Sequence, residues 1–288
     1  MAALIKAGRE VAPTGETVFF RSFFALPPIL IYALWRGRIA EAWRVRDPLA
    51  HATRGVVGVA AMACGFTALG FLPLPEVIAV GFAQPLLATA LAALLLREEV
   101  RLFRWTAVAV GLVGVVVMLW PRLTLFRAGE VDETAAFGAM LALAGAALGA
   151  FAAIHIRRLV ATESTLSVVF WFSVTCTLVS LFTAPFGWVL PDARVTAMLI
   201  AAGLLGGTAQ ILMTEGYVHA GAATLAPFDY TAMVYGLLIG WLAFAEIPGW
   251  PVLGGAAVVI GAGLYIIHRE RRLRIDRTSS RSAGSMSS

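Results

Sequence analysis

Nine long apolar runs dominate this chain, and each is long enough to cross a lipid bilayer. They cover residues 16–35, 55–72, 74–96, 103–120, 135–154, 165–186, 195–214, 220–244 and 251–267. Roughly 18 to 25 residues are available in each run, and a helix needs about 20 to span the hydrocarbon core. In lipid each run must be helical, because unpaired backbone groups find no water there. The sequence therefore predicts an all-α, polytopic membrane protein with nine full spans.

The composition of the chain also indicates a membrane environment. The chain is 60% hydrophobic and 14% charged, with a mean hydropathy of +0.85, which excludes an ordinary water-soluble domain. The net charge of +5 does not indicate nucleic-acid binding, because the basic residues are spread over loops that anchor helices beside anionic lipid. We expect a small-molecule substrate and membrane lipid as partners, and no nucleic acid. A homodimer is a further possible assembly.

The chain also resembles itself at an offset of 147 positions. Four segments match without a gap: Leu94–Val100 with Trp241–Ile247, Phe66–Leu69 with Met213–Gly216, Glu16 with Glu163, and Gly114 with Gly261. A register shared by several segments predicts two copies of one helical unit, which is typical of secondary transporters. Glu99 and Glu246 then end equivalent helices, which favours a structural role for both.

The repeat divides the chain into three parts. Residues 1–130 form the first copy, residues 131–268 the second, and residues 269–288 a polar tail that we expect to be disordered and cytoplasmic. In the second copy the helix Phe137–Ile154 precedes a basic turn, and its counterpart would begin before Met1. Only MAALIKAG remains of it, so we expect the first copy to be truncated and the natural chain to have ten spans.

Arginine sets the expected orientation, because basic loops mark the cytoplasmic side. Lys6, Arg9, Arg122, Arg127 and Arg194 fall on one side. Sixteen arginines fall on the other: 36, 38, 44, 46, 54, 97, 101, 104, 157, 158, 269, 271, 272, 274, 277 and 281. The C-terminus is then cytoplasmic. The two copies have opposite orientations, as in carriers that open alternately to either side.

Glycines indicate where helices meet. Gly145 and Gly149 have GxxxG spacing, as do Gly236 and Gly240, and one further helix carries Gly203, Gly206 and Gly207. Small residues allow close backbone approach in lipid, so we interpret them as packing positions.

Asp229 is the most informative polar residue at membrane depth. It lies about nine residues into its run, roughly 13 Å deep at 1.5 Å per residue. Pro227 precedes it, and Pro85 follows Gln84 in the equivalent run of the first copy. A proline frees a backbone carbonyl one turn earlier, and paired breaks in matching helices point to a central binding site. The alternative is that both kinks serve packing alone.

Four further residues complete the candidate substrate site. Tyr230 follows Asp229, and Trp171 lies about two turns inside its run, where it either faces a cavity or packs against a neighbour. Arg21 and Glu76 lie near the outer face. They could pair to close the outer mouth, receive the carboxylate and ammonium of a zwitterion, or extend separately to the headgroups.

The sequence offers no catalytic or metal-binding motif. HExxH, GxSxG and GxxxxGK[ST] are absent, and Cys64 and Cys176 sit in separate runs without ligand spacing. We therefore expect no enzyme activity, no cofactor and no metal. An intramembrane enzyme is a rival class, which the absence of these motifs disfavours. A receptor or assembly protein without transport is another, and a flux measurement would separate it from a carrier.

Three strings carry a family resemblance: ETVFFRSFFAL at 16–26, PLLATALAALLLREEV at 85–100 and APFDYTAMVYGLLIGWLAFAEIP at 226–248. They resemble the EamA-type branch of the drug/metabolite transporter superfamily, in particular its S-adenosylmethionine carrier-like members. The resemblance implies ten helices in two inverted five-helix halves. It also implies a central cavity lined mainly by helices one, three, four, six, eight and nine.

The expected function is secondary transport across the bacterial inner membrane by alternating access. The substrate would be a small amphiphilic metabolite, cationic or zwitterionic, similar to S-adenosylmethionine or to an amino acid. A drug or amino-acid exporter of the same fold is the alternative.

Overall fold

Helices make up all the regular structure that the computed structural model describes, over residues 1–9, 11–95, 102–120, 133–189, 191–219 and 231–285. In chain order they are α1 (Ala2–Gly8), α2 (Thr14–Phe23), α3 (Leu26–Trp35), α4 (Ile39–Trp43), α5 (Pro48–Ala68), α6 (Leu74–Gly81), α7 (Ala83–Leu95), α8 (Leu102–Leu119), α9 (Glu133–Leu159), α10 (Thr165–Leu181), α11 (Ala193–His219), α13 (Thr231–Phe244) and α14 (Trp250–Ser285). The all-α prediction is confirmed.

The described residues contain seven helical segments long and apolar enough to cross a membrane. Two shorter apolar helices, α10 and α13, fall inside the predicted runs 165–186 and 220–244. Residues 220–230 of the second run lie outside the described part of the chain. The protein is therefore a multi-pass membrane protein.

Prolines break two of the predicted runs. In the run at 74–96, α6 ends at Gly81 and α7 begins at Ala83, so the chain breaks just before Pro85, as the freed Gly81 carbonyl predicts. The run at 16–35 is also two helices, α2 and α3, and the Pro27–Pro28 pair at the start of α3 explains this second break.

Two helix boundaries differ most from the sequence prediction. Helix α5 begins at Pro48 instead of residue 55, because the Asp47 side chain caps it by accepting a hydrogen bond from Ala50 N at 3.0 Å. Helix α14 continues to Ser285, past Arg269, where composition predicted a disordered tail. The stretch after Arg269 is rich in Arg with Glu and Leu, all good helix formers.

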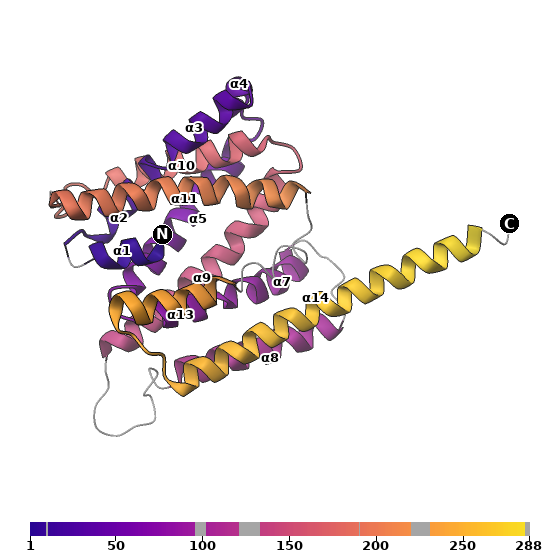
Figure 1. Ribbon diagram of the computed structural model, residues 1–288. Helices are drawn as coiled ribbons and strands as arrows, with labels where there is room; N and C mark the ends of the chain where they lie inside the picture. The colour runs from indigo at the N-terminus through magenta and orange to yellow at the C-terminus, as the bar shows by residue number, and fades with distance from the viewer. Residues whose placement is uncertain (10, 96–101, 121–132, 190, 220–230, 286–288) are drawn as a thin grey trace.

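The helices pack in two neighbouring groups (Figure 1). In one group, α2 and α10 contact each other and both α5 and α11. Helix α9 packs against α5 of this group and against α6 and α7. Helix α8 lies along α14, where a β-carbon on Gly114 would stand 2.8 Å from the carbonyl oxygen of Gly255. In α11, a β-carbon on Gly207 would stand 2.6 Å from the carbonyl oxygen of Ala25. Both positions need glycine, because no side chain fits between the backbones.

Two buried carboxylates make matching contacts in the α2–α10 pair. Glu16, near the start of α2, accepts a hydrogen bond from Val189 N at 3.2 Å, just before α11. Glu163, just before α10, accepts from Arg46 N at 2.6 Å and Asp47 N at 3.0 Å, just before α5. The offset of 147 relates the two glutamates, and it also carries α5 onto α11. Each glutamate thus fastens its helix to the start of the other copy's next long helix.

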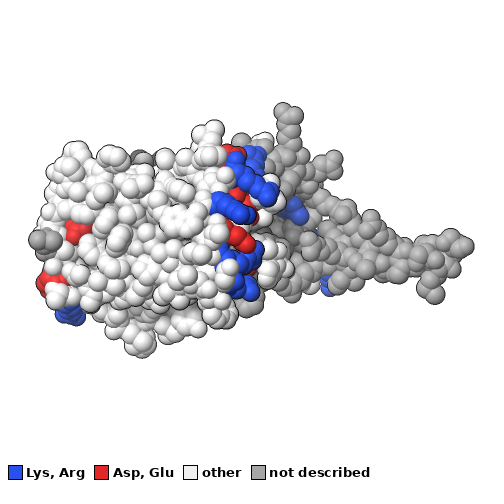
Figure 2. Space-filling model, turned by 90° about the horizontal axis from the view of Figure 1, so that it is seen from above, with Lys and Arg blue, Asp and Glu red and all other residues white. Residues whose placement is uncertain are grey.

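The exterior is apolar over a broad zone. On the face that Figure 2 shows, charged side chains gather in a band at one end and in a few positions at the other, with a wide uncharged surface between them. Large apolar side chains such as Ile31, Leu212 and Leu242 are at least 66% exposed. A surface of this kind is stable only against lipid.

Candidate functional site

Two arginines are buried inside the group formed by α2, α5, α10 and α11. Arg21 projects from α2 and Arg54 from α5, and each residue is 5% exposed. Arginine is almost never buried without a partner, so the surroundings of this pair define the first candidate site.

The ring of Phe172, near the middle of α10, lies against both arginines. The guanidinium carbon of Arg54 is 3.9 Å from the ring centroid and that of Arg21 is 5.7 Å away. A cation over an aromatic face is attracted by the negative face of the ring. Phe172 therefore holds one face of the Arg54 guanidinium and orients the Arg21 guanidinium beside it.

Glycines make room for both guanidinium groups. A β-carbon on Gly206 of α11 would stand 3.0 Å from Arg21 Nε. One on Gly58, a turn after Arg54 in α5, would overlap Arg54 Nη1 and the ring of Phe172. The two arginines therefore occupy closely fitted positions between helices.

Several polar atoms in this region have no hydrogen-bond partner within the described residues. They are Nε and Nη1 of Arg21, Nε and Nη1 of Arg54, Oγ of Ser173, Nε2 of Gln210 and Nε1 of Trp171. Gln210 lies one turn after Gly206 in α11, so both occupy the same helix face. Buried donors without acceptors are uncommon in proteins and mark a place where a ligand or water completes the bonding.

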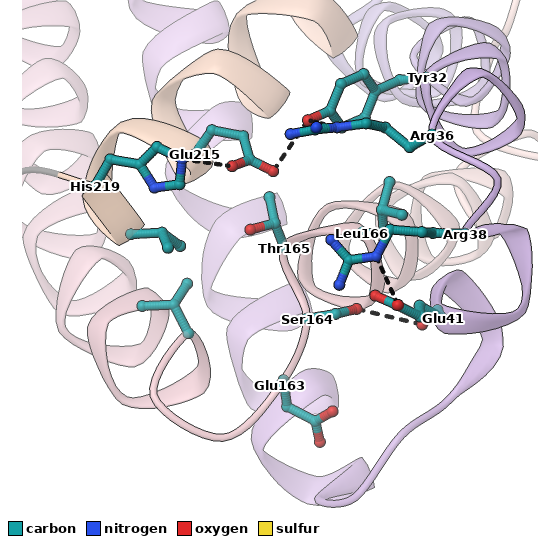
Figure 3. Close-up of a pocket in the computed structure, with 12 residues that line it drawn as sticks. Tyr32, Arg36, Arg38, Glu41, Glu163, Ser164, Thr165, Leu166, Glu215 and His219 are labelled. Atoms are coloured by element: carbon teal, nitrogen blue, oxygen red, sulfur yellow. Dashed lines mark hydrogen bonds and ion pairs between the residues drawn. The ribbon is translucent and has the colours of Figure 1, made fainter.

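A pocket of about 230 Å³ lies at the end of the bundle that carries Arg36 and Arg38. Figure 3 shows its polar lining. Tyr32 Oη donates to Glu215 Oε1 at 3.2 Å, Arg36 Nε donates to Tyr32 Oη at 3.2 Å, and His219 Nε2 is 3.9 Å from Glu215 Oε2. Groups of both charges face this space.

On another wall of the pocket, Arg38 Nε is 2.6 Å from Glu41 Oε1. The hydrogen bond to Glu41 and its charge raise the pKa of Arg38 above the ordinary arginine value. Arg38 therefore stays cationic at this exposed rim.

At the opposite end of the bundle, Lys6 of α1 joins two loops. Lys6 Nζ lies 2.6 Å from Glu246 Oε1 and donates to the carbonyl of Leu72 at 2.9 Å, while Leu74 N donates to Glu246 Oε2 at 2.8 Å. These contacts tie α1, the start of α6 and the segment after α13 together. The structural interpretation of Glu246 is therefore supported.

The structure separates the predicted substrate residues into two groups. Arg21 and Trp171 belong to the packed pair α2 and α10, and Trp171 is half-buried against Phe170. Gln84 lies in α7, where a β-carbon on Gly149 of α9 would stand 2.6 Å from its Oε1.

Glu76 is buried near the start of α6. No ion pair found within the described ranges joins Arg21 to Glu76. Asp229 and Tyr230 lie outside the described residues.

Sequence reasoning missed Arg54 and Phe172. The apolar run begins after Arg54, which therefore counts as a cytoplasmic loop residue by hydropathy, and the structure instead places it inside α5. The Asp47–Pro48 pair, a capping residue followed by a proline at the first helical position, is the signal that could have revealed the earlier start. No group of three or more His, Cys, Asp or Glu able to hold a metal ion occurs in the described part of the chain.

Comparison with known proteins identifies similar chains over almost the full length. The model of the EamA-like transporter family matches residues 1–120 and 136–268. A crystal structure of a protein with 22% sequence identity superposes with a TM-score of 0.66 and covers 94% of this chain and 96% of that one. At this identity the likeness concerns the fold alone.

Three named relatives have different cargoes. The S-adenosylmethionine uptake transporter of Rickettsia prowazekii (strain Madrid E) is 29% identical, with 89% of this chain and 84% of that protein covered. The pseudopaline exporter CntI of Pseudomonas aeruginosa (strain PAO1) is 30% identical, with 91% and 89% covered. The riboflavin transporter of Rhizobium johnstonii (strain 3841) is 28% identical, with 90% and 83% covered.

Proposed function

Because the chain belongs to the EamA-like transporter family, we propose that it is a secondary transporter for a small amphiphilic metabolite that carries a cationic or zwitterionic group. The family and its relatives indicate a transporter rather than an enzyme. The observation that carries the proposal is the group of buried polar atoms of Arg21, Arg54, Ser173 and Gln210 that find no hydrogen-bond partner among the described residues, inside a bundle whose exterior is apolar. Polar groups at membrane depth are costly and are typical of substrate pathways.

Alternating access would follow from two inverted halves, residues 1–130 and 131–268. Two features support this division. Glu16 and Glu163, which are 147 positions apart, make matching contacts. Helices α8 and α14, which the same offset identifies as equivalent helices of the two copies, pack against each other. Inverted halves around a central site can rock to expose it to either side.

The membrane assignment is the bacterial inner membrane, with the C-terminus in the cytoplasm. The exposed arginines between α3 and α5, together with those at the end of α9, support this orientation, because basic loops stay inside. The pocket beside Arg36 would then face the cytoplasm and the Lys6–Glu246 contacts the periplasm.

The proposed substrate site includes Asp229, Tyr230, Gln84, Trp171, Arg21 and Glu76. Asp229 would meet the positive group of the substrate, and the aromatic side chains of Trp171 and Tyr230 would offer faces for cation–π contact or stacking. The position of Gln84 between α7 and α9, beside the break that Pro85 causes, supports a role close to the interface of the halves.

Export is the second candidate direction, since one relative is named an uptake transporter and another an exporter. The test is flux into liposomes that contain the purified protein. Labelled S-adenosylmethionine and riboflavin would be supplied with and without a proton gradient, against protein-free liposomes. We expect saturable flux of at least one probe.

Vesicles of known, opposite orientation would show the preferred direction. Flux of every probe at the level of protein-free liposomes would contradict the proposed function for these substrates.

A further inference from the structure

We propose that Arg21 and Arg54 together bind the carboxylate of the transported molecule, so that the substrate is a zwitterion with a free carboxylate. This inference rests on the proposed function and names its substrate class. It assigns a binding role to Arg54, to Phe172 and to the interface between α2, α5, α10 and α11.

Charge is the first argument. Both guanidinium groups lie against the same ring, that of Phe172, and none of the ion pairs within the described ranges includes either one. A buried, uncompensated positive charge is strongly unfavourable, and two near each other are more so. The described residues supply no countercharge, so an anion from outside the chain is the simplest means of neutralising the pair.

Geometry is the second argument. Phe172 contacts the guanidinium groups through its ring, which satisfies a face but not the N–H groups in the guanidinium plane. Those N–H groups remain unpartnered at Nε and Nη1 of both arginines within the described residues. The Nε–Nη edge of a guanidinium matches the two oxygens of a carboxylate, with two parallel hydrogen bonds.

The depth of the site favours a carboxylate over a lipid phosphate. Phe172 lies near the middle of α10, away from the headgroup region. The glycines at 58 and 206 let the guanidinium groups pack closely against α5 and α11, and the planar edge of a guanidinium matches the planar carboxylate group. Ser173 Oγ and Gln210 Nε2 are further buried donors on the facing helices.

The location also suits transport. Arg21 and Arg54 belong to the first copy, whereas Phe172, Ser173 and Gln210 belong to the second. A carboxylate held by the two arginines and by Ser173 or Gln210 would bridge the two halves, and its arrival or departure would change the contacts between them. Binding could then alter the relative position of the halves, as alternating access requires.

The test compares paired probes that differ only in the carboxylate. Thermal stability of the purified full-length protein in detergent would be measured with S-adenosylmethionine and decarboxylated S-adenosylmethionine, with methionine and methioninamide, and with inorganic phosphate and chloride. We expect wild type to be stabilised by at least one carboxylate probe. Its partner without the carboxylate should bind about tenfold or more weakly, the effect of losing one charge-assisted hydrogen bond.

Variants connect this selectivity to the arginines. Arg54→Gln and Arg21→Gln should remove the preference for the acid over its partner, whereas Arg46→Gln, the same change at an exposed arginine, should retain it. The wild-type comparison between probes needs no variant and stays decisive if either buried substitution prevents folding.

Three results would overturn the inference: equal stabilisation by acid and neutral partners, stabilisation by phosphate or chloride alone, and no carboxylate-dependent stabilisation of wild type by any probe. Failure of the proposed function is a separate result. It would appear as carboxylate-dependent binding without any flux into liposomes.

Discussion

Because Gly207 has no side chain, the backbone at Ala25, between α2 and α3, packs directly against α11. A β-carbon there would stand 2.6 Å from the carbonyl oxygen of Ala25 and 2.7 Å from its Cα, and backbone atoms cannot move aside as a flexible side chain can. The glycine pattern in α11 therefore marks a packing position, as its sequence predicted. Gly261 of α14 is also a helical glycine, but a β-carbon there would meet no neighbouring helix of the described chain within 4 Å.

We predict opposite effects for the same substitution at these two glycines. Gly207→Ala should destabilise the protein by roughly 1–3 kcal/mol, because the helices must separate. Gly261→Ala should be neutral or stabilising by up to about 1 kcal/mol, because alanine is the better helix former. Thermal unfolding in detergent measures both, and equal behaviour of the two variants would contradict the packing at Gly207.

At the scale of helices, Lys6 and Glu246 connect α1 with the segment after α13 and with the start of α6. Both side chains are largely buried, with 14% and 20% exposed. Lys6→Met should cost on the order of 2 kcal/mol, since it removes hydrogen bonds to a charged group and leaves Glu246 partly buried without its cation.

The control is Arg38→Met, which breaks the exposed Arg38–Glu41 pair. It should cause no measurable loss of stability, because exposed ion pairs are screened by water and salt. Thermal unfolding of the two variants in one detergent provides the comparison. Equal loss in both would show that the Lys6 contacts do not hold these helices together.

Sequence reasoning was most accurate for the helices themselves. Within the described residues, each predicted apolar run contains one helix or two consecutive helices, and the break before Pro85 lies where the missing backbone donor predicts it. The start of α5 was missed because hydropathy detects where apolar residues begin, whereas a helix can begin earlier at a capping residue such as Asp47. For this reason the sequence did not indicate Arg54 as a residue of the candidate site.

The contacts of Arg54 with Phe172 could not be predicted from either residue. They depend on how α5 and α10 pack, and these helices are far apart in sequence. Asp229 was singled out by its depth and by the paired prolines at 227 and 85, and it stays a prediction because it lies outside the described residues.

At the scale of the whole molecule, the proposed inverted halves make a prediction about sidedness. A cysteine introduced at Gly249, before α14, should react with an impermeant thiol reagent added from the periplasm, whereas one at Gly284 should react only after the membrane is opened. The native Cys64 and Cys176 would first be replaced by serine or alanine, with retained folding checked by size-exclusion chromatography. The reverse labelling pattern would contradict the orientation and the inverted arrangement with it.

Counterflow in proteoliposomes tests the central claim, alternating access at a charged site, most directly. Liposomes with wild-type protein, loaded with unlabelled S-adenosylmethionine, should take up labelled S-adenosylmethionine transiently. Asp229→Asn, which removes a charge at nearly constant size, should reduce this exchange by at least about tenfold while folding and insertion stay normal. Normal exchange by a folded Asp229→Asn protein, or no exchange by wild type, would contradict the account.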